Sequence, residues 1–243
     1  CIDILNQHPV HFTPQEFVNT LSSITPRLYS ISSSPKSHPR EVHLTVAIIK
    51  YNNFERDRFG LATGELSNRI EVNKTRIPVY IQPTKEFVIP EDRSKDIIMI
   101  GPGTGIAPFR AFLEQRIEEK GAGRNWLFFG EVHEKSTFFY KDEWFEAMKN
   151  GHLQKLTTAF SRDQKHKIYI QHRLLGNSKE IWEWLQSGSY FYVCGDKQYM
   201  AKDVHSALIE IAQKEGKLKK EDAENYINQT LMKDERRYLR DVY

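Results

Sequence analysis

The chain has 243 residues, of which 39% are hydrophobic and 28% are charged, so it can bury a core and is not a disordered tail. Lys and Arg number 35 against 32 Asp and Glu, and the formal charge of +3 is too balanced to favour a nucleic-acid partner. No stretch approaches the roughly 20 consecutive apolar residues of a membrane span, and the N-terminus lacks a signal-peptide pattern. We therefore expect a cytoplasmic protein with no nucleic-acid or membrane partner.

The chain has two cysteines, Cys1 and Cys194, which are too few for a disulfide scaffold. Cys194 ends an apolar run, 190–194, that is typical of a buried strand, and this fits a reducing compartment. We predict no metal site. Because residue 1 is Cys rather than Met, we expect the chain to be part of something longer.

The first third of the chain is predicted to be mainly antiparallel β structure. Thr13, Pro14 and Glu16 form a capping box that starts a helix through about Leu21. Alternating apolar and polar residues then predict strands, with a short helix before the last of them. The predicted strands are 27–34, 41–51 and 76–81, and the helix is 65–70. Strands with little helix between them favour an antiparallel sheet or barrel.

After Pro90 the pattern changes to alternating strands and helices. Short apolar strands are predicted at 96–100, 126–129, 156–160 and 190–194. Helices are predicted at 107–120, 142–149, 178–185, 200–213 and 221–232. This alternation predicts a doubly wound parallel sheet, with a domain boundary near Pro90.

A glycine-rich segment, 101–108, follows the first strand of this second domain and opens its first helix. Backbone amides and the helix dipole at such a turn can hold a pyrophosphate, and glycine lets the backbone approach the ligand. Gly103 and Thr104 are the candidate contacts. The segment differs from the G-x-G-x-x-G fingerprint, so an ordinary strand-to-helix turn stays open as an alternative.

Five segments in this order resemble the ferredoxin-NADP reductase family, specifically its diflavin branch, which includes cytochrome P450 reductase and the bacterial sulfite reductase flavoprotein. The segments are 27–30, 60–63, 101–108, 161–162 with 167–171, and 194–196 leading to 200–203. The ending, 236–243, most resembles the sulfite reductase flavoprotein because it stops on an aromatic residue. The resemblance implies an α/β and β fold. A partial antiparallel FAD-binding β-barrel at 1–90, with the last helix of a connecting domain at 13–22, precedes a doubly wound parallel-sheet NADP-binding domain at 91–243.

The resemblance implies three groups of FAD-binding residues. The first group, Arg27, Leu28, Tyr29 and Ser30, would supply a guanidinium for the pyrophosphate, a ring along the isoalloxazine and a hydroxyl near flavin N5. The second group, Thr45, Val46, Ala47 and Tyr51, would supply a strand under the FAD and a ring that stacks on the adenine. The third group, Gly60, Leu61, Ala62 and Thr63, would form a second pyrophosphate loop. Strand alternation puts Tyr29 and Ser30 on opposite faces, so one contact needs a bent backbone or an edge.

The resemblance also implies an NADP-binding set, in which Ser161, Arg162, Lys167 and Tyr169 place two cations and two hydroxyls just past a strand end, suited to the 2′-phosphate. The set is Ser161, Arg162, Lys167, Ile168, Tyr169, Ile170, Gln171 and Asp203, together with Gly103 and Thr104. Asp163 is the one carboxylate beside them, and it could pair with Arg162 or point to solvent. A charged surface loop is the plain alternative for residues 161–167.

Four residues carry the implied catalytic cluster. By resemblance, Ser30, Cys194 and Asp241 surround nicotinamide C4 and flavin N5, and the ring of Tyr243 covers the flavin and moves aside for nicotinamide. Taken alone, Cys194 would be a buried core residue and Tyr243 a frayed C-terminus.

The implied activity is that of an NADPH-dependent flavoprotein reductase, in which hydride passes from NADPH to FAD and single electrons pass through FMN to a haem protein. The implied partners are an FMN domain, absent from this chain, and a haem-containing sulfite reductase subunit. The alternatives are a cytochrome P450 reductase-type diflavin enzyme and a non-catalytic NADP-binding fragment. In the family, further barrel strands precede the connecting domain, so the barrel in this chain is expected to be incomplete.

Overall fold

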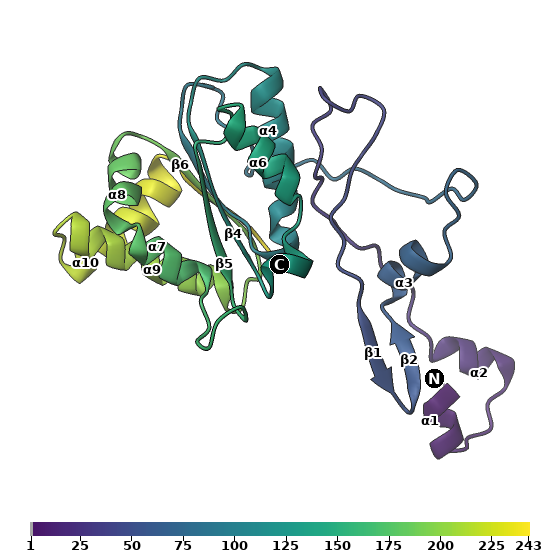
Figure 1. Ribbon diagram of the computed structural model, residues 1–243. Coiled ribbons are helices and arrows are strands. Elements are labelled where there is room, and N and C mark those ends of the chain that lie inside the picture. Colours follow the sequence, from purple (N-terminus) through teal and green to yellow (C-terminus); the bar gives the residue numbers. More distant parts are fainter. Residues whose placement is uncertain (1) are drawn as a thin grey trace. The chain divides into compact units, whose positions relative to one another are not determined.

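The computed structural model describes residues 2–243, and Cys1 lies outside the described residues. The chain divides into two compact units (Figure 1). The first holds the residues up to Tyr29 together with Val46–Tyr80, and the second holds Ser30–Thr45 and Ile81–Tyr243. Residues 30–45 therefore belong to the same unit as the C-terminal two thirds of the chain.

The first unit is small and mixed. It contains helices α1 (Ile2–Gln7), α2 (Pro14–Asn19) and α3 (Leu61–Asn68) and the two-stranded antiparallel sheet of β1 (Lys50–Asn53) and β2 (Arg56–Phe59). The predicted capping box is confirmed, since Thr13 Oγ1 accepts the N–H of Glu16 at 3.3 Å and the Glu16 carboxylate accepts the N–H of Thr13 at 2.8 Å. Helix α3 begins at Leu61, four positions before the predicted start, because Gly60 serves as its N-cap.

Two predicted strands in this part are wrong. Among the described residues, 27–34 and 76–81 form no strand, and of 41–51 only the end lies in β1. The one ladder contact near them is an isolated antiparallel bridge between Ile31 and Leu44. Alternation predicts an extended backbone, but a strand also needs a continuous ladder of hydrogen bonds to a neighbour, and beside this bridge residues 27–34 have only the bond from the N–H of Ser32 to His43 O.

The second unit is built on a five-stranded, fully parallel sheet with the order β5-β4-β3-β6-β7. The strands are β3 (Ile97–Ile100), β4 (Asn125–Glu131), β5 (Lys155–Phe160), β6 (Tyr190–Gly195) and β7 (Tyr238–Val242). The chain moves outward from β3 to β5 and then returns to place β6 on the other side of β3. The order reverses there, which confirms the predicted doubly wound sheet.

Helices cover both faces of this sheet (Figure 1). On one face lie α4 (Ala107–Glu118) and α6 (Lys141–Lys149), and on the other lie α7 (Ile170–Gly176), α8 (Ser178–Gln186), α9 (Met200–Glu215) and α10 (Lys220–Asn225). Side chains of β3 alternate between the two cores: Ile97 and Met99 pack with α4 and α6, and Ile98 and Ile100 pack with the second set. Burial on both faces is why these strands read as continuous apolar runs.

Several elements of this unit escape the sequence patterns. They are the short helix α5 (Glu134–Thr137), the helix α7, the 3₁₀ turn η1 (Gly103–Ile106), the π geometry of the segment η2 (Tyr226–Asp234) and the edge strand β7. The segment η2 continues α10, so the predicted helix at 221–232 is confirmed in extent, but its second half has π geometry. It leads directly into β7, whose carboxyl end carries Asp241.

Within residues 2–243, no helix combines the length and the apolar character that crossing a membrane requires.

Gly105 offers a test of the packing between η1 and β6. A Cβ at Gly105 would lie 2.1 Å from the backbone oxygen of Cys194, and backbone cannot rotate away as a side chain can. We expect Gly105→Ala to lower the free energy of unfolding by about 1–3 kcal/mol. Urea denaturation followed by circular dichroism measures this. Gly176→Ala is the matched control, because no atom lies within 4 Å of its added Cβ, and an equal loss in both variants would contradict the packing argument.

Candidate functional site

The candidate site lies at the carboxyl ends of β3 and β6, the neighbouring strands at which the sheet order reverses. Open parallel sheets bind ligands at this position. After β3 the chain enters η1 and then α4, so the segment predicted to hold phosphate lies at this edge. Gly103 has φ +56° and Gly195 has φ +131°, conformations that favour glycine. The backbones of Gly105 and Cys194 approach so closely that no side chain fits between them.

Three predicted catalytic side chains meet at this edge. Asp241 Oδ2 accepts a hydrogen bond from Ser30 Oγ at 3.2 Å and is approached by Cys194 Sγ at 3.9 Å. The strand register explains the second contact, because Cys194 of β6 pairs directly with Asp241 of β7. One carboxylate oxygen of Asp241 thus contacts both a hydroxyl and a thiol, and the three groups come from segments more than 40 residues apart.

Cys194 is fully buried, and its thiol is held in the neutral form. Burial, with a further contribution from the negative charge of Asp241, raises the pKa of the Cys194 thiol to about 12. The thiolate is the nucleophilic form of cysteine, so this residue is unsuited to covalent catalysis at neutral pH. It is instead a buried, neutral polar group at the end of β6.

Tyr243 is anchored although it is the last residue of the chain. Its N–H donates to the carbonyl of Gly195 at 3.1 Å, and its own carbonyl accepts from the N–H of Lys197 at 3.0 Å. The phenol oxygen lies 3.0 Å from Thr104 Oγ1, in the segment predicted to hold phosphate. The residue is nevertheless 64% exposed.

The predicted 2′-phosphate residues lie on the loop between β5 and α7, next to the end of β4. The N–H of Ser161 donates to Glu131 O at 2.8 Å, and the N–H of Arg162 donates to Val132 O at 3.0 Å, so the backbone of this loop is tied to its neighbour. Within residues 2–243, the side chains of Arg162 and Lys167 form no ion pair. Both are exposed and are available to an anionic group.

Asp163 takes neither of the two positions considered from the sequence. Its carboxylate accepts from the N–H of Glu134 at 2.8 Å and lies 2.8 Å from His133 Nδ1. These contacts, the backbone bond first, lower the pKa of Asp163. The carboxylate therefore caps the start of α5 and does not neutralise Arg162.

The rest of this predicted set is divided between surface and core. Gln171 Nε2 donates to Asp203 Oδ2 at 2.8 Å, which joins two candidates from α7 and α9. Tyr169 is exposed and precedes α7. Ile170 is buried in the hydrophobic core and Ile168 packs partly against it, so their side chains are structural.

The predicted FAD-binding residues lie in both units. In the first unit, Arg27 donates to Thr25 Oγ1 at 2.8 Å, and the buried Thr63 Oγ1 accepts from the N–H of Ile49 at 3.2 Å. The Thr63 hydroxyl is thus used within the unit and is directed inward. The remaining candidates there are exposed or half-buried, namely Leu28, Tyr29, Val46, Ala47, Tyr51, Gly60, Leu61 and Ala62. In the second unit, Thr45 Oγ1 lies 2.7 Å from the hydroxyl of Tyr140.

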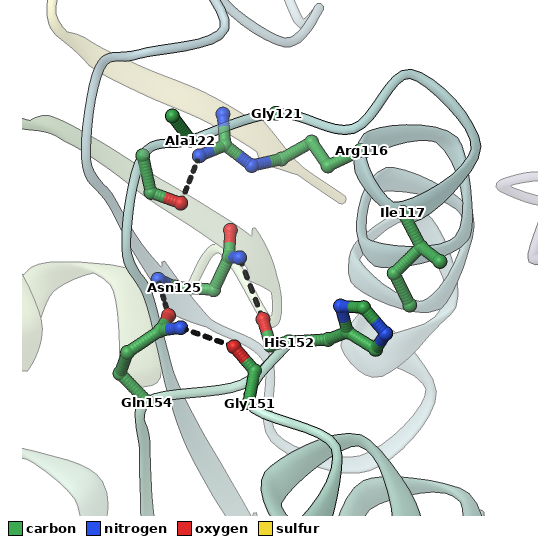
Figure 2. Close-up of a pocket in the computed structure, with 9 residues that line it drawn as sticks. Arg116, Ile117, Gly121, Ala122, Asn125, Gly151, His152 and Gln154 are labelled. Atoms are coloured by element: carbon green, nitrogen blue, oxygen red, sulfur yellow. Dashed lines mark hydrogen bonds between the residues drawn. The ribbon is translucent and has the colours of Figure 1, made fainter.

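A small pocket of about 110 Å³ lies elsewhere, at the amino ends of β4 and β5 (Figure 2). Asn125 and Gln154 hold its wall through a 2.6 Å bond, and Arg116, only 2% exposed, donates to Gly123 O at 2.8 Å and Lys95 O at 2.9 Å. Burial lowers the pKa of Arg116. Because ligands of such sheets bind at the opposite edge, we assign this pocket a structural role.

Comparison with known families agrees with this arrangement. The family described as FAD binding domain matches residues 1–64, and the family described as oxidoreductase NAD-binding domain matches residues 99–206. The two matches follow each other in the predicted order. The chain therefore carries an FAD-binding part followed by a nicotinamide-dinucleotide-binding oxidoreductase part, and these predicted cofactors are confirmed at the level of domain family.

Curated relatives identify the particular resemblance. The chain is 47% identical over 242 residues to the sulfite reductase [NADPH] flavoprotein alpha-component of Mannheimia succiniciproducens, 45% identical to that of Vibrio parahaemolyticus and 44% identical to that of Bacillus subtilis. Each match covers 100% of this chain but only 40%, 38% and 40% of the relative. The predicted resemblance to the diflavin branch is confirmed, and the chain spans about two fifths of the length of these relatives.

The environment of Cys194 gives a direct test. Because the charge of Asp241 adds to burial in raising the pKa of the thiol, we expect Asp241→Asn to lower that pKa and, during the brief local openings that expose the buried thiol, to speed alkylation of Cys194 several-fold at pH 9. Iodoacetamide labelling followed by mass spectrometry of the Cys194 peptide measures this and separates it from Cys1. Asp203→Asn, a distant carboxylate change, should leave the labelling rate unaltered. Equal rates in the wild type and Asp241→Asn would contradict the contact.

Proposed function

We propose that this chain is the FAD- and NADPH-binding part of a flavoprotein reductase of the sulfite reductase type. The observation that supports this best is the meeting of Ser30, Cys194 and Asp241 beside the glycine-rich turn at the sheet reversal. The names of the curated relatives agree with it. Bound NADPH and FAD would supply the redox chemistry, with a hydride passing from nicotinamide C4 to flavin N5 to give NADP⁺ and reduced flavin.

The residues present fit a dinucleotide at this edge. The contact between Gly105 and Cys194 leaves backbone, without side chains, where η1 meets β6. The start of α4 follows at once, and a helix N-terminus favours phosphate. Gly103 and Thr104 would hold the pyrophosphate, and Tyr243 would cover the neighbouring surface from its contact with Thr104.

The catalytic cluster would act through position and charge. Hydride transfer requires no strong acid or base, and the neutral Cys194 thiol matches that requirement. A carboxylate at Asp241 favours the positive charge that develops on the nicotinamide ring as it is oxidised. Ser30 would present its hydroxyl to flavin N5 while Asp241 holds its oxygen in place.

Preference for NADPH would come from the loop after β5. Ser161, Arg162 and Lys167 offer a hydroxyl and two cations, and the Asp163 carboxylate is bonded to His133 and the start of α5. Tyr169 would line the same end of the cofactor, and Gln171 with Asp203 would support it from α7 and α9. This arrangement favours a phosphate over a free ribose diol.

The FAD side would use residues that carry a guanidinium, rings and a glycine-rich helix start. These are the sets 27–30, 45–47 with Tyr51, and 60–63. We retain the proposed division of the chain near Pro90 into an FAD side and an NADP side. Single electrons would then pass through FMN on a domain absent from this chain to a haem-containing sulfite reductase subunit in the cytoplasm.

A spectroscopic experiment tests this proposal. The protein, reconstituted with FAD, is mixed with NADPH without oxygen, and the flavin absorbance should bleach. In the natural full-length protein, electron delivery to a cytochrome P450 but not to the haem subunit of sulfite reductase would favour the second diflavin type. Protein that binds NADP⁺ but cannot hold FAD would favour the non-catalytic binding fragment.

Arg162 is the residue that most directly distinguishes NADPH from NADH. We expect Arg162→Ala to weaken NADPH binding about 10- to 100-fold and to leave NADH binding nearly unchanged, because the lost charge-assisted bonds reach only the 2′-phosphate. Titration calorimetry with both nucleotides measures this. Lys179→Ala, an exposed cation on α8, is the control. Equal losses for both nucleotides would contradict the assignment.

Tyr243 should control access of nicotinamide. Deleting Tyr243 should improve the use of NADH several-fold, because the ring no longer has to be displaced by a weakly held cofactor. Tyr243→Phe, which keeps the ring and loses the contact with Thr104, should retain the preference for NADPH. Steady-state kinetics with both nucleotides would show this. An unchanged preference after the deletion would count against a gating role.

A further inference from the structure

Residues 30–45, which we call the clasp, fold back on themselves. The N–H of Ser32 donates to His43 O at 2.8 Å, and the N–H of His43 donates to Ser33 Oγ at 3.0 Å. Ile31 and Leu44 form an antiparallel bridge between these two limbs. The clasp therefore has its own backbone connections, and both of its ends continue into the first unit.

The clasp is fastened to α4. Glu114 Oε2 accepts from the N–H of Ser34 at 2.7 Å, and Gln115 accepts from the Ser34 hydroxyl at 2.5 Å. Lys36 forms an ion pair with Glu119 at 2.7 Å, just beyond the helix. Residues 32–34 are buried. Ser34 bonds α4 directly, Ser33 Oγ bonds within the clasp, and Ser32 faces α4 through its carbonyl.

Arg110 of α4 is the centre of the arrangement. Its NH1 donates to Ser32 O at 2.7 Å and to His43 Nδ1 at 3.2 Å, so one nitrogen contacts both limbs of the clasp. Its other nitrogens pair with Glu114 at 3.0 Å and with Glu143 of α6 at 2.6 Å. The guanidinium also lies 5.0 Å from the ring centre of Tyr140, whose hydroxyl contacts Thr45. Only a planar fork with several donors can make these contacts together.

The same contact explains a neighbouring cluster. His38, Glu41 and His43 bring possible metal-ligand atoms within 4.8 Å of one another. Because arginine only donates, His43 Nδ1 accepts and its proton lies on Nε2, which faces Glu41 at 2.9 Å. The histidine nitrogen that faces Glu41 therefore carries a proton and is not free for a metal. The cluster is part of the clasp.

We propose that Arg110 is a positioning residue for hydride transfer, which it assists by holding the clasp and thereby the hydroxyl of Ser30 on Asp241. Ser30 lies two residues before the carbonyl that Arg110 binds, and Ser30 Oγ is 3.2 Å from Asp241. Helix α4 also begins immediately after the glycine-rich turn. Helix α4 thus follows directly from the glycine-rich turn that is proposed to lie beside the nicotinamide. Through Arg110 it also holds the segment that carries the Ser30 hydroxyl, which is proposed to face the flavin. This inference rests on the proposed function for its catalytic part.

Hydrogen exchange tests the clasp without any cofactor. In the chain alone, Arg110→Lys keeps the charge but cannot contact both limbs, so the amides of residues 30–45 should exchange about tenfold faster. Amides of β3 and β6 should exchange at the wild-type rate. Lys36→Ala, which breaks only the exposed ion pair of the same clasp, is the matched control and should have little effect. Wild-type exchange in Arg110→Lys would overturn the proposal.

Single-turnover kinetics test the catalytic consequence in the natural full-length holoenzyme. Arg110→Lys should slow flavin reduction by NADPH about tenfold or more, enlarge the isotope effect with deuterated NADPH, and leave NADP⁺ affinity unchanged. Ser34→Ala, which loosens the clasp from its other side, should act in the same direction. Loss of NADP⁺ affinity equal to the loss of rate would overturn the positioning role. Failure of the wild type to reduce flavin would instead refute the proposed function, and the exchange experiment would still decide the clasp.

Discussion

The parallel pairing of β7 with β6 determines what chemistry the second unit can offer. Its register sets Asp241 beside Cys194 and Val242 beside Gly195, and the bond from Tyr243 to Gly195 continues it to the end of the chain. Paired residues on adjacent strands lie side by side on one face, so the thiol and carboxylate are neighbours by construction. A slip of one residue would turn the carboxylate to the other face, away from Ser30.

Local sequence patterns predicted most of the parallel half, because strands buried on both faces are short apolar runs between polar turns. The strand β7 was not predicted as a strand because it lacks such a run. Its residues 238–242 include Arg240 and Asp241, it lies at the sheet edge, and it has no apolar run. Its conformation comes from hydrogen bonds to β6, which is distant in sequence, and a local pattern does not contain that information.

The errors in the first third have the same origin. Residues 27–34 and 76–81 alternate as strands do, but pairing partners decide whether an extended segment becomes a strand. Side-chain contacts between loops were equally hidden: Asp163 was predicted to pair with Arg162 or face solvent, and it binds His133 and the start of α5. The resemblance supplied the residues that we propose to carry the chemistry, whereas the contacts that would orient them, Arg110 above all, are visible only in three dimensions.

The charged groups along the edge of the sheet are separated from the groups proposed to lie at the redox centre. Under that proposal the cations at Arg162 and Lys167 hold the phosphate end of NADPH, where charge-assisted bonds are strong. The redox end meets a hydroxyl, a neutral thiol and a single carboxylate, with Tyr243 anchored across it. Binding energy would thus come from contacts far from the reacting carbon. The groups at that carbon would favour the oxidised nicotinamide ring over the reduced one. That is the division expected of a site whose remote contacts bind the cofactor and whose nearest groups stabilise the transition state.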